Sequence, residues 1–220
     1  MINNPIFTLN EFPNPSIIKK IWKHPHIHES QKLNIKKYCD KYIENKVKVD
    51  YYMKYDYGRL QLKDATIFSS VAQWNAIRST LFSDTEYDID IVGCHQNILL
   101  GICKGVVVCD KLEYYCNNRK LIIDDININE AIITKFNDLN QDNKTKYIIF
   151  DVDKFYVKSC KTLSIILQDI ERLIILDAFL FLQILHNVTI TSYNYDGFQV
   201  LKNTFNIDLI PLLNKEIAKK

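Results

Sequence analysis

The stretch YDIDIVGCH, residues 87–95, places two aspartates, Asp88 and Asp90, in an apolar, β-branched setting. Side chains alternate between the two faces of a β-strand, so residues two apart leave the same face. The pattern therefore predicts a strand over residues 86–92 that presents two carboxylates side by side. This strand leads directly into a helix that we predict over about residues 95–104.

A second acidic motif follows about a hundred residues later. The stretch SYNYDGF, residues 192–198, lies between the runs VTIT and FQVL. Asp-Gly favours a tight turn, which predicts a β-hairpin over residues 188–201 with Asp196 at its tip. Asp-Gly is also common in purely structural turns, but the flanking Tyr193 and Tyr195 favour a functional carboxylate. Carboxylates brought together from two strands would form an oxygen site for Mg²⁺.

The composition is that of a folded protein of 220 residues, with 47% hydrophobic residues and a formal net charge of +2. This length fits one large domain or two small ones. The six cysteines contain no C-x-x-C pair, which favours reduced thiols inside a cell. The longest apolar segment, residues 163–185, is interrupted by four charged residues, and the first residues lack a signal-peptide pattern. We therefore expect an intracellular protein without a membrane span.

The N-terminal region is basic. Residues 16–55 contain ten lysines and four acids. Ser16 is predicted to cap a helix that ends at about Lys23, and a second helix is predicted over residues 31–45, with Leu33, Tyr38 and Ile43 turned inward. Such a region suits contact with a polyanion such as nucleic acid, although a lysine-rich helix face is equally common as plain solvated surface.

Three further elements are predicted between these landmarks. Residues 47–62 alternate loosely and predict a strand with a bend at Gly58. Residues 68–82 have apolar side chains at helical spacing, which places Arg78 close to the acidic strand that follows. A long helix is predicted over residues 162–186.

In this order the chain resembles the palm of family A DNA polymerases. It is most similar to the divergent polymerase-like domains of transposons, virophages and large DNA viruses of protists. The first motif of that group has the pattern Asp-x-x-Asn-x-His-Pro-x-Ile-Leu and follows a Gly-Arg and an Ile-Arg. Here Gly58-Arg59, Ile77-Arg78 and DIVGCHQNIL, residues 90–99, occur in the same order. The similarity spans about residues 57–201.

The resemblance implies an α+β fold in which a small antiparallel sheet packs on helices. A basic, largely helical N-terminal region, residues 1–56, would precede a palm-like catalytic core, residues 57–220. Such a protein would be a template-directed nucleotidyltransferase that replicates a viral or mobile element by a two-metal-ion mechanism. Its partners would be a DNA primer–template, deoxynucleoside triphosphates and other replication proteins, in the cytoplasm or nucleus of an infected cell.

The resemblance also assigns roles to individual residues. Asp90 and Asp196 would be the catalytic carboxylates that hold Mg²⁺ or Mn²⁺, with Asp88 as a third metal ligand. Lys146, or Lys144 in its place, would meet the triphosphate. His95 would pack near the sugar of the nucleotide, although it also suits an ordinary place at the start of a helix. The residues assigned to substrate binding are Arg59, Arg78, His95, Arg119 and Tyr195.

The chain departs from the family pattern at three places. Gly93 replaces a polar residue, Gln96 replaces a proline, and residues 150–154, FDVDK, stand where a Tyr-Gly-like segment is expected after the lysine. These departures put nucleotide selection in doubt and favour the first of two alternatives, whereas clustered acids suit the second equally well. One is a catalytically inactive palm that acts as a nucleic-acid-binding or replisome scaffold, and the other is a metal-dependent nuclease.

Overall fold

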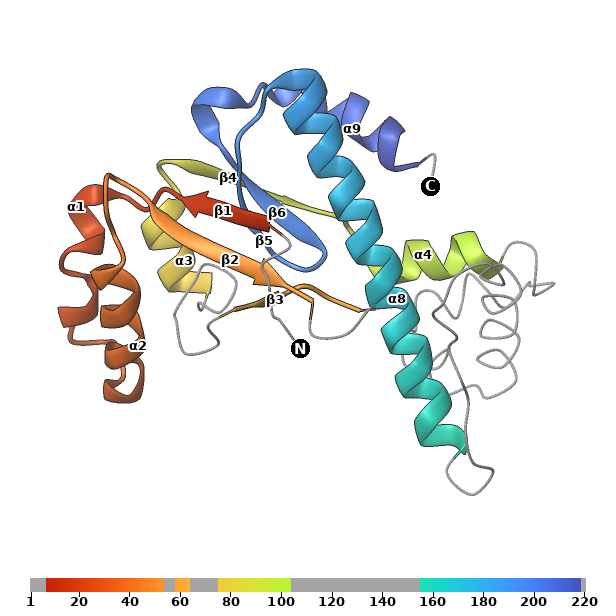
Figure 1. Cartoon of the computed structure of the whole chain (residues 1–220), viewed down its shortest axis with the longest axis horizontal. Helices are drawn as coiled ribbons and strands as arrows, with labels where there is room; N and C mark the ends of the chain where they lie inside the picture. The colour runs from red at the N-terminus through yellow and green to blue at the C-terminus, as the bar shows by residue number, and fades with distance from the viewer. Residues whose placement is uncertain (1–6, 54–57, 64–74, 104–154, 219–220) are drawn as a thin grey trace. The chain divides into compact units, whose positions relative to one another are not determined.

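The structure, a computed structural model, describes residues 7–53, 58–63, 75–103 and 155–218. Helices and two small antiparallel sheets make up this part of the chain, which confirms the predicted α+β class (Figure 1). The chain divides into two compact units. Unit 1 comprises Met1–Lys54, Leu60–Asp90 and Ile174–Lys220, and unit 2 comprises Tyr55–Arg59 and Ile91–Leu173. The predicted boundary after residue 56 separates a basic N-terminal region from a palm-like core by function. It stays a prediction.

The first sheet of unit 1 has the order β1-β2-β3. Strands β1 (Phe7–Glu11) and β3 (Gln61–Leu62) are both antiparallel to β2 (Val47–Tyr52). Alternate residues of β2 are buried, as expected for a strand with one face on a core. The prediction of one bent strand over residues 47–62 is wrong. Gly58 has a φ of 87°, which lies outside the β region, so the chain forms two separate strands.

Short helical segments follow β1, namely α1 (Pro15–Ile18) and the 3-10 helix η1 (Ile21–Lys23). The sequence predicted one helix that Ser16 caps and that ends at about Lys23, and this is wrong. The N-cap is Asn14, whose side-chain oxygen accepts the backbone N–H of Ser16 at 2.9 Å, and Pro15 occupies the first helical position. Lys20 has a φ of −127°, which leaves the helical region and splits the predicted helix.

Helix α2 (Glu29–Asp40) ends five residues before its predicted end at residue 45. Glu44 and Asn45 have φ values of 52° and 63°, the left-handed conformation of a tight turn. Backbone hydrogen bonds between Ile43 and Lys46 close this turn. The turn returns the chain directly into β2, so the helix cannot continue.

The buried face of α2 carries Ile35 and Tyr38, which have no exposed surface. Tyr38 was predicted to face inward, and this is confirmed. Leu33 and Ile43 were predicted to do the same, but they are 60% and 67% exposed. Leu33 lies two residues from Ile35 and therefore on the opposite side of the helix, and Ile43 lies beyond the helix end.

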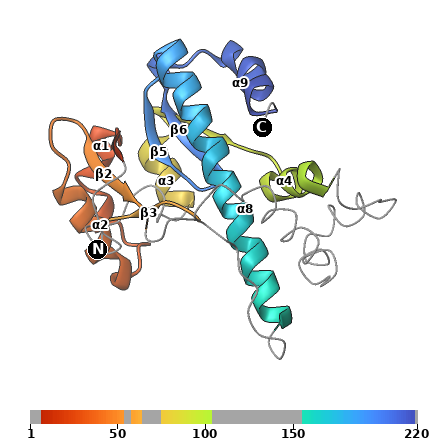
Figure 2. The ribbon, with the colours of Figure 1, turned by 45° about the vertical axis from the view of Figure 1, so that its right-hand side comes forward.

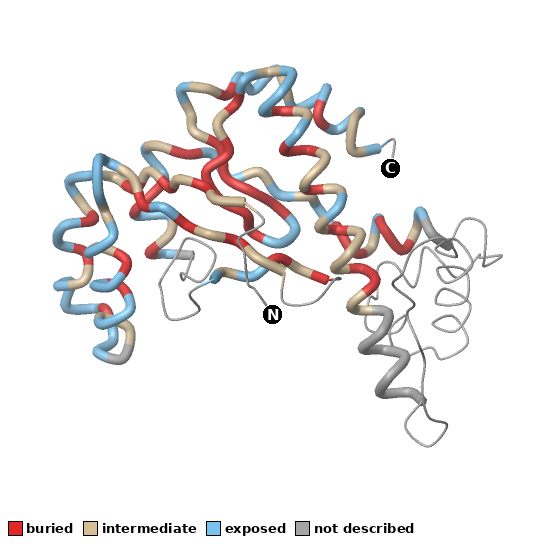
Figure 3. Tube along the Cα trace, viewed as in Figure 1, coloured by how far each residue is buried: buried red, intermediate tan, exposed pale blue. Residues whose placement is uncertain are grey.

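The second sheet of unit 1 has the order β4-β6-β5, with all neighbours antiparallel. It consists of β4 (Glu86–Asp90), β5 (Ile190–Tyr193) and the central β6 (Gly197–Leu201). On one face, Phe179 packs edge-on against Phe198 and Tyr193, with ring centroids 5.1 Å and 6.5 Å apart. Figure 3 shows that β5 and β6 are among the most buried segments in the described part of the chain. The predicted strand and hairpin are both confirmed.

A β-bulge shifts the register of β5 on β6. Ile190 pairs with Val200, but the next paired residue is Ser192, opposite Gln199. Thr191 is therefore the extra residue of the bulge. The bulge places Ser192 on the sheet face of Gln199, whereas Tyr193 shares the apolar face of its partner Phe198.

Helix α8 (Phe155–Leu180) continues as the π-helix η4 (Phe181–Leu185), close to the predicted end of the long helix (Figures 1 and 2). The predicted start at residue 162 is wrong, because the helix begins seven residues earlier. No helix in the described ranges is long and apolar enough to cross a membrane. The other described helical segments are α3 (Asn75–Phe82), α4 (Cys94–Cys103), the 3-10 helices η5 (Lys202–Thr204) and η6 (Ile207–Leu209), and α9 (Ile210–Ile217).

In the described part of unit 1, two glutamates are buried, Glu11 at the end of β1 and Glu86 at the start of β4, with 0% and 5% exposure. The hydroxyl of Tyr38 donates to Glu11 at 2.6 Å, and the backbone N–H of Phe12 donates to Glu86 at 3.0 Å. Burial, together with the neighbouring charge of Glu11, raises the pKa of Glu86 to about 8, although the Phe12 N–H opposes this shift. Glu86 is therefore protonated in the folded protein at neutral pH.

The raised pKa of Glu86 predicts a stability that falls as pH rises. An unfolded glutamate titrates near pH 4.3, so between this value and about pH 8 the folded state binds more protons than the unfolded state. Glu86→Gln keeps a neutral side chain and should raise the Tm at pH 8.5 by at least about 3 °C, with a smaller gain at pH 5. Thermal unfolding across this pH range measures the effect. The exposed control Glu44→Gln should track the wild type, and parallel curves for Glu86→Gln and wild type would contradict the prediction.

Candidate active site

Strand β4 presents Asp88 and Asp90 on one face of the second sheet. Their partners on β6 are Gln199 and Gly197. Directly paired residues of an antiparallel sheet share a face, so all four lie on the face opposite Phe198. Both aspartates are exposed, which leaves their carboxylates accessible.

The hairpin between β5 and β6 carries Asp196 at its tip. The backbone N–H of Asn194 donates to the carbonyl of Gly197 at 2.9 Å, so Tyr195 and Asp196 are the two central residues of the turn. Tyr195 takes the left-handed conformation, with a φ of 66°. The expectation that Asp196 and Gly197 form the centre of the turn is therefore wrong, because the closing hydrogen bond lies one residue earlier along the chain.

Gly197 is required by the close approach of Asp90. A β-carbon built on Gly197 would overlap Oδ1 of Asp90 and the carbonyl oxygen of Ile89, and it would lie 3.0 Å from the Cα of Asp90. Any larger residue would push the two strands apart or displace the carboxylate. The pairing thus brings the carboxylate of Asp90 directly beside the residue that follows Asp196.

Two polar partners hold Asp88. Arg78, on α3, donates through its Nη2 to one carboxylate oxygen at 2.5 Å, and the amide of Asn194 donates to the other at 3.3 Å. Asn194 is itself 7% exposed and lies 3.3 Å from the hydroxyl of Ser192, which also donates to Gln199 at 2.8 Å. This buried chain of amides and hydroxyls ties the hairpin tip to β4.

The charges of the three aspartates influence one another. Partial burial raises the pKa of Asp90, the neighbouring charges of Asp88 and Asp196 raise it further, and Arg78 lowers it. Like charges that raise a carboxyl pKa are a common feature of sites that receive a cation or a proton. The interaction places Asp90 and Asp196 within electrostatic reach of each other.

Of the three aspartates Asp88, Asp90 and Asp196, two offer carboxylate oxygens of the kind that Mg²⁺ binds. Among the described residues, no group of three or more His, Cys, Asp or Glu side chains is arranged to hold a metal ion. Mg²⁺ commonly binds one or two carboxylates and completes its shell with water and substrate phosphates, so it does not require a third. Asp90 and Asp196 are two exposed carboxylates that could hold such an ion. Asp88 already has two hydrogen-bonding partners, which favours a positioning role over ligation.

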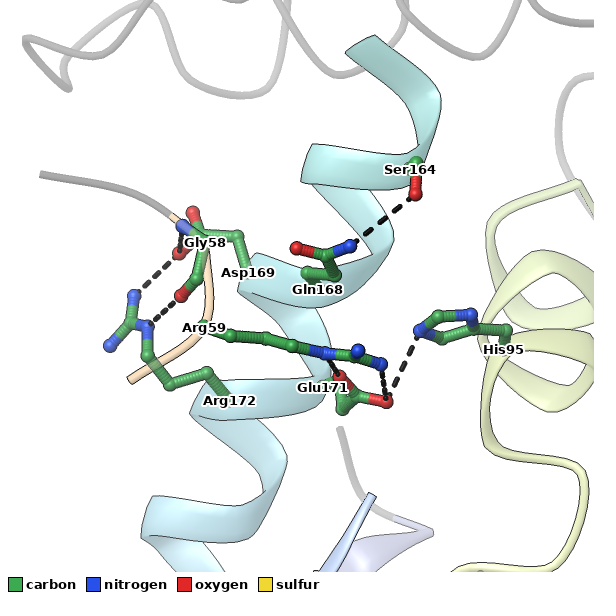
Figure 4. Close-up of polar contacts among 8 residues, drawn as sticks. All are labelled: Gly58, Arg59, His95, Ser164, Gln168, Asp169, Glu171 and Arg172. Atoms are coloured by element: carbon green, nitrogen blue, oxygen red, sulfur yellow. Dashed lines mark hydrogen bonds and ion pairs between the residues drawn. The ribbon is translucent and has the colours of Figure 1, made fainter. Parts of the chain in front are cut away.

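Arg59 and His95, which were assigned to substrate binding, both contact Glu171 of α8 in unit 2 (Figure 4). Arg59 approaches Glu171 with Nε at 2.6 Å and Nη2 at 3.1 Å, and Nε2 of His95 lies 3.1 Å from the same carboxylate. Glu171 is 1% exposed. Burial raises the pKa of Glu171, but hydrogen bonds and charges from His95 and Arg59 outweigh burial and lower it overall.

The same turn of α8 also fastens the backbone of Gly58. Oδ1 of Asp169 accepts the Gly58 N–H at 3.2 Å, and Nε of Arg172 donates to the Gly58 carbonyl at 3.0 Å (Figure 4). Arg172 also pairs with Asp169 at 2.6 Å. Gly58 and Arg59 are thus held to the helix through both backbone and side chain.

The remaining assigned residues are Tyr195, Lys146 and Arg119. Tyr195 is 41% exposed at the hairpin tip, and its ring meets that of Tyr193 edge-on at 6.3 Å. Lys146 and Arg119, like Lys144, lie outside the described residues.

Sequence reasoning missed Glu171 and Asn194. The signal for Glu171 was a charged residue within an apolar helix, where a fully buried acid requires a cationic partner. Asn194 had no comparable signal, because its role depends on how the hairpin pairs with β4.

The charge of Arg78 gives a first prediction for this site. Arg78→Gln should raise the pKa of Asp90 further, because the guanidinium group lowers it. A pH titration of the Asp90 carboxyl ¹³C resonance measures the change. Lys48→Gln removes an equal charge from an exposed position on β2 and should leave this pKa unchanged. The same shift in both variants would contradict a local effect.

The burial of Glu171 gives a second prediction. Glu171→Gln removes the charge that Arg59 and His95 share, and it should lower the free energy of unfolding by about 2 kcal/mol. This is less than the roughly 3–5 kcal/mol for a fully buried pair because Arg59 is 28% exposed. Urea unfolding gives the value. Glu29→Gln breaks an exposed pair with Lys32 and should cost less than about 0.5 kcal/mol. Equal costs would show that the buried network contributes no more than a surface pair.

Comparisons of the chain with protein-family models, curated proteins and solved structures find no match.

Proposed function

We propose that the chain is a polymerase-like palm and transfers nucleotides from deoxynucleoside triphosphates to a primer on a DNA template. The single observation that carries the proposal is the pairing of Asp90 with Gly197, which sets Asp90 beside the hairpin tip that bears Asp196. Two exposed carboxylates, one on β4 and one in the hairpin turn that leads into β6, form a donor set for divalent cations that carry phosphates. The order of motifs along the chain supports the same function.

In this proposal Asp90 and Asp196 hold Mg²⁺ or Mn²⁺. The bound ions would activate the attacking hydroxyl and stabilise the charge that develops on the transferred phosphate. Asp88 anchors Arg78 beside the two ligands, and Asn194 keeps Asp88 turned toward its partners. Tyr195, exposed at the tip of the hairpin, is available to contact the substrate. Lys146 and Arg119 would meet the triphosphate.

The proposal extends to the setting of the reaction. The resemblance to polymerases of transposons, virophages and large DNA viruses supports a role in the replication of a viral or mobile element. Other replication proteins would be its partners, inside the cytoplasm or nucleus of an infected cell.

A second candidate is an inactive palm that binds nucleic acid as a scaffold. The observation that favours it is the engagement of Arg59 and His95 by the buried Glu171. Side chains held in an internal network have a structural reason to be present, so their occurrence in the family order does not by itself support contact with a nucleotide.

The test of catalysis is primer extension with Mg²⁺ or Mn²⁺ on DNA and RNA templates. Asp90→Ala and Asp196→Ala should each lose at least about a hundredfold in rate, because removal of one electrostatic stabiliser of the transition state costs roughly 3–4 kcal/mol. Asp88→Ala should lose less. The exposed acid Asp208 on η6 provides the matched control Asp208→Ala, which should retain full activity.

The outcomes separate the candidates. Wild-type protein that binds nucleic acid but neither incorporates nucleotides nor cleaves the strand would favour the scaffold. Cleavage without incorporation, lost in Asp90→Ala, would favour a nuclease. Circular dichroism of each variant verifies folding, because an exposed carboxylate contributes little to packing.

A further inference from the structure

One aromatic ring in unit 1 has two lysines over it. Nζ of Lys23 lies 5.1 Å from the centroid of the Trp22 ring, and Nζ of Lys36 lies 5.4 Å from it. Trp22 and Lys23 belong to η1, whereas Lys36 comes from α2. These distances are those of cation–π interactions, which restrict where a flexible lysine places its charge. We call these three residues the Trp22 cluster.

The surface around the Trp22 cluster is strongly basic. Residues 15–41 contain seven lysines but only two acids. One of the acids, Glu29, pairs with Lys32, so Lys32 is neutralised locally. Lys23 and Lys36 are both exposed, and no ion pair with a carboxylate is found for either within the described ranges. Within the described part of the chain, the charges of Lys23 and Lys36 are therefore not balanced by a carboxylate ion pair.

The arrangement is suited to a polyanion with flat, apolar groups. Holding two ammonium groups at one ring reduces the conformational entropy that would be lost when an anion binds. Proteins that bind single strands combine a basic track for the phosphates with aromatic side chains on which bases stack. A free phosphate would contact only the ammonium groups of Lys23 and Lys36. An acidic peptide carries negative charges but has no flat group on each residue to stack on Trp22.

We propose that the Trp22 cluster is a binding site for single-stranded nucleic acid, with phosphates on Lys23 and Lys36 and Trp22 next to the bases. The site rests on the nucleic-acid partner of the proposed function but not on catalysis. Lys32 is not part of this site because Glu29 engages it, whereas Trp22 is partly exposed.

The test uses Trp22 as its own reporter. The chain has two tryptophans, so Trp74→Phe leaves Trp22 as the sole indole. In this background, a 20-nucleotide oligo-dT is titrated in EDTA, which removes any contribution from metal at Asp90 and Asp196. Trp22 fluorescence and the anisotropy of labelled oligo-dT are followed together. Both signals should saturate at the same concentration.

A charge-matched pair of variants locates the site. Lys23→Gln/Lys36→Gln should weaken binding at least about tenfold and reduce the slope of log K against log salt by about 1.4, since each phosphate contact on a single strand contributes about 0.7. Lys48→Gln/Lys215→Gln removes two exposed lysines from β2 and α9 and should leave the slope unchanged. Circular dichroism confirms that α2 remains helical in both.

Each of the following three outcomes would overturn the proposal. Equal losses in the two double variants would show a diffuse charge effect without a site. Binding of poly-glutamate or tripolyphosphate as tight as that of oligo-dT would show an anion site without nucleic-acid preference. Saturation of anisotropy with no change in Trp22 fluorescence would place the strand elsewhere. None of these results bears on primer extension, so the two proposals fail independently.

Discussion

The contact between Asp90 and Gly197 is the constraint on which the candidate active site depends. It requires that β4 pair with β6 in one register and that residue 197 have no side chain. A slip of one residue would turn Asp88 and Asp90 to the apolar face occupied by Phe198. On the other side of β6, the bulge at Thr191 also fixes which face each residue occupies. It places Ser192 on the polar face of the sheet and Tyr193 on the apolar face. The position of Asp196 follows from this pairing.

The buried acids Glu171 and Glu86 avoid an isolated charge in two different ways. In unit 2, Glu171 pairs with the guanidinium group of Arg59 and contacts Nε2 of His95, and these two partners lower its pKa. In unit 1, Glu86 lies near another acid, Glu11, and keeps its proton instead. Both arrangements avoid an isolated buried charge, which would be far more costly. The first arrangement ties a loop to a helix, and the second links the stability of unit 1 to pH.

Much of the second sheet was predictable because its signals are local. The alternation around Asp88 and the turn signal before Gly197 predicted β4 and the hairpin correctly. The N-terminal helices were predicted less well. Asn14 rather than Ser16 caps the first, since Pro15 favours the first helical position, and two left-handed residues, Glu44 and Asn45, end the second region early. Several neighbouring residues can cap or end a helix with similar free energies. The local sequence pattern does not show which of them does so.

The sequence by itself determined the face that carries Asp88 and Asp90 and the hairpin with Asp196 at its tip, because strand periodicity and turn chemistry act over a few neighbouring residues. The tertiary structure alone decided which of the charged residues meet. Arg78 reaches Asp88 from α3, and Arg59 shares Glu171 with His95 although 112 residues separate Arg59 from Glu171. Such pairs form between segments that only folding brings together, and no local pattern in the sequence specifies their partners.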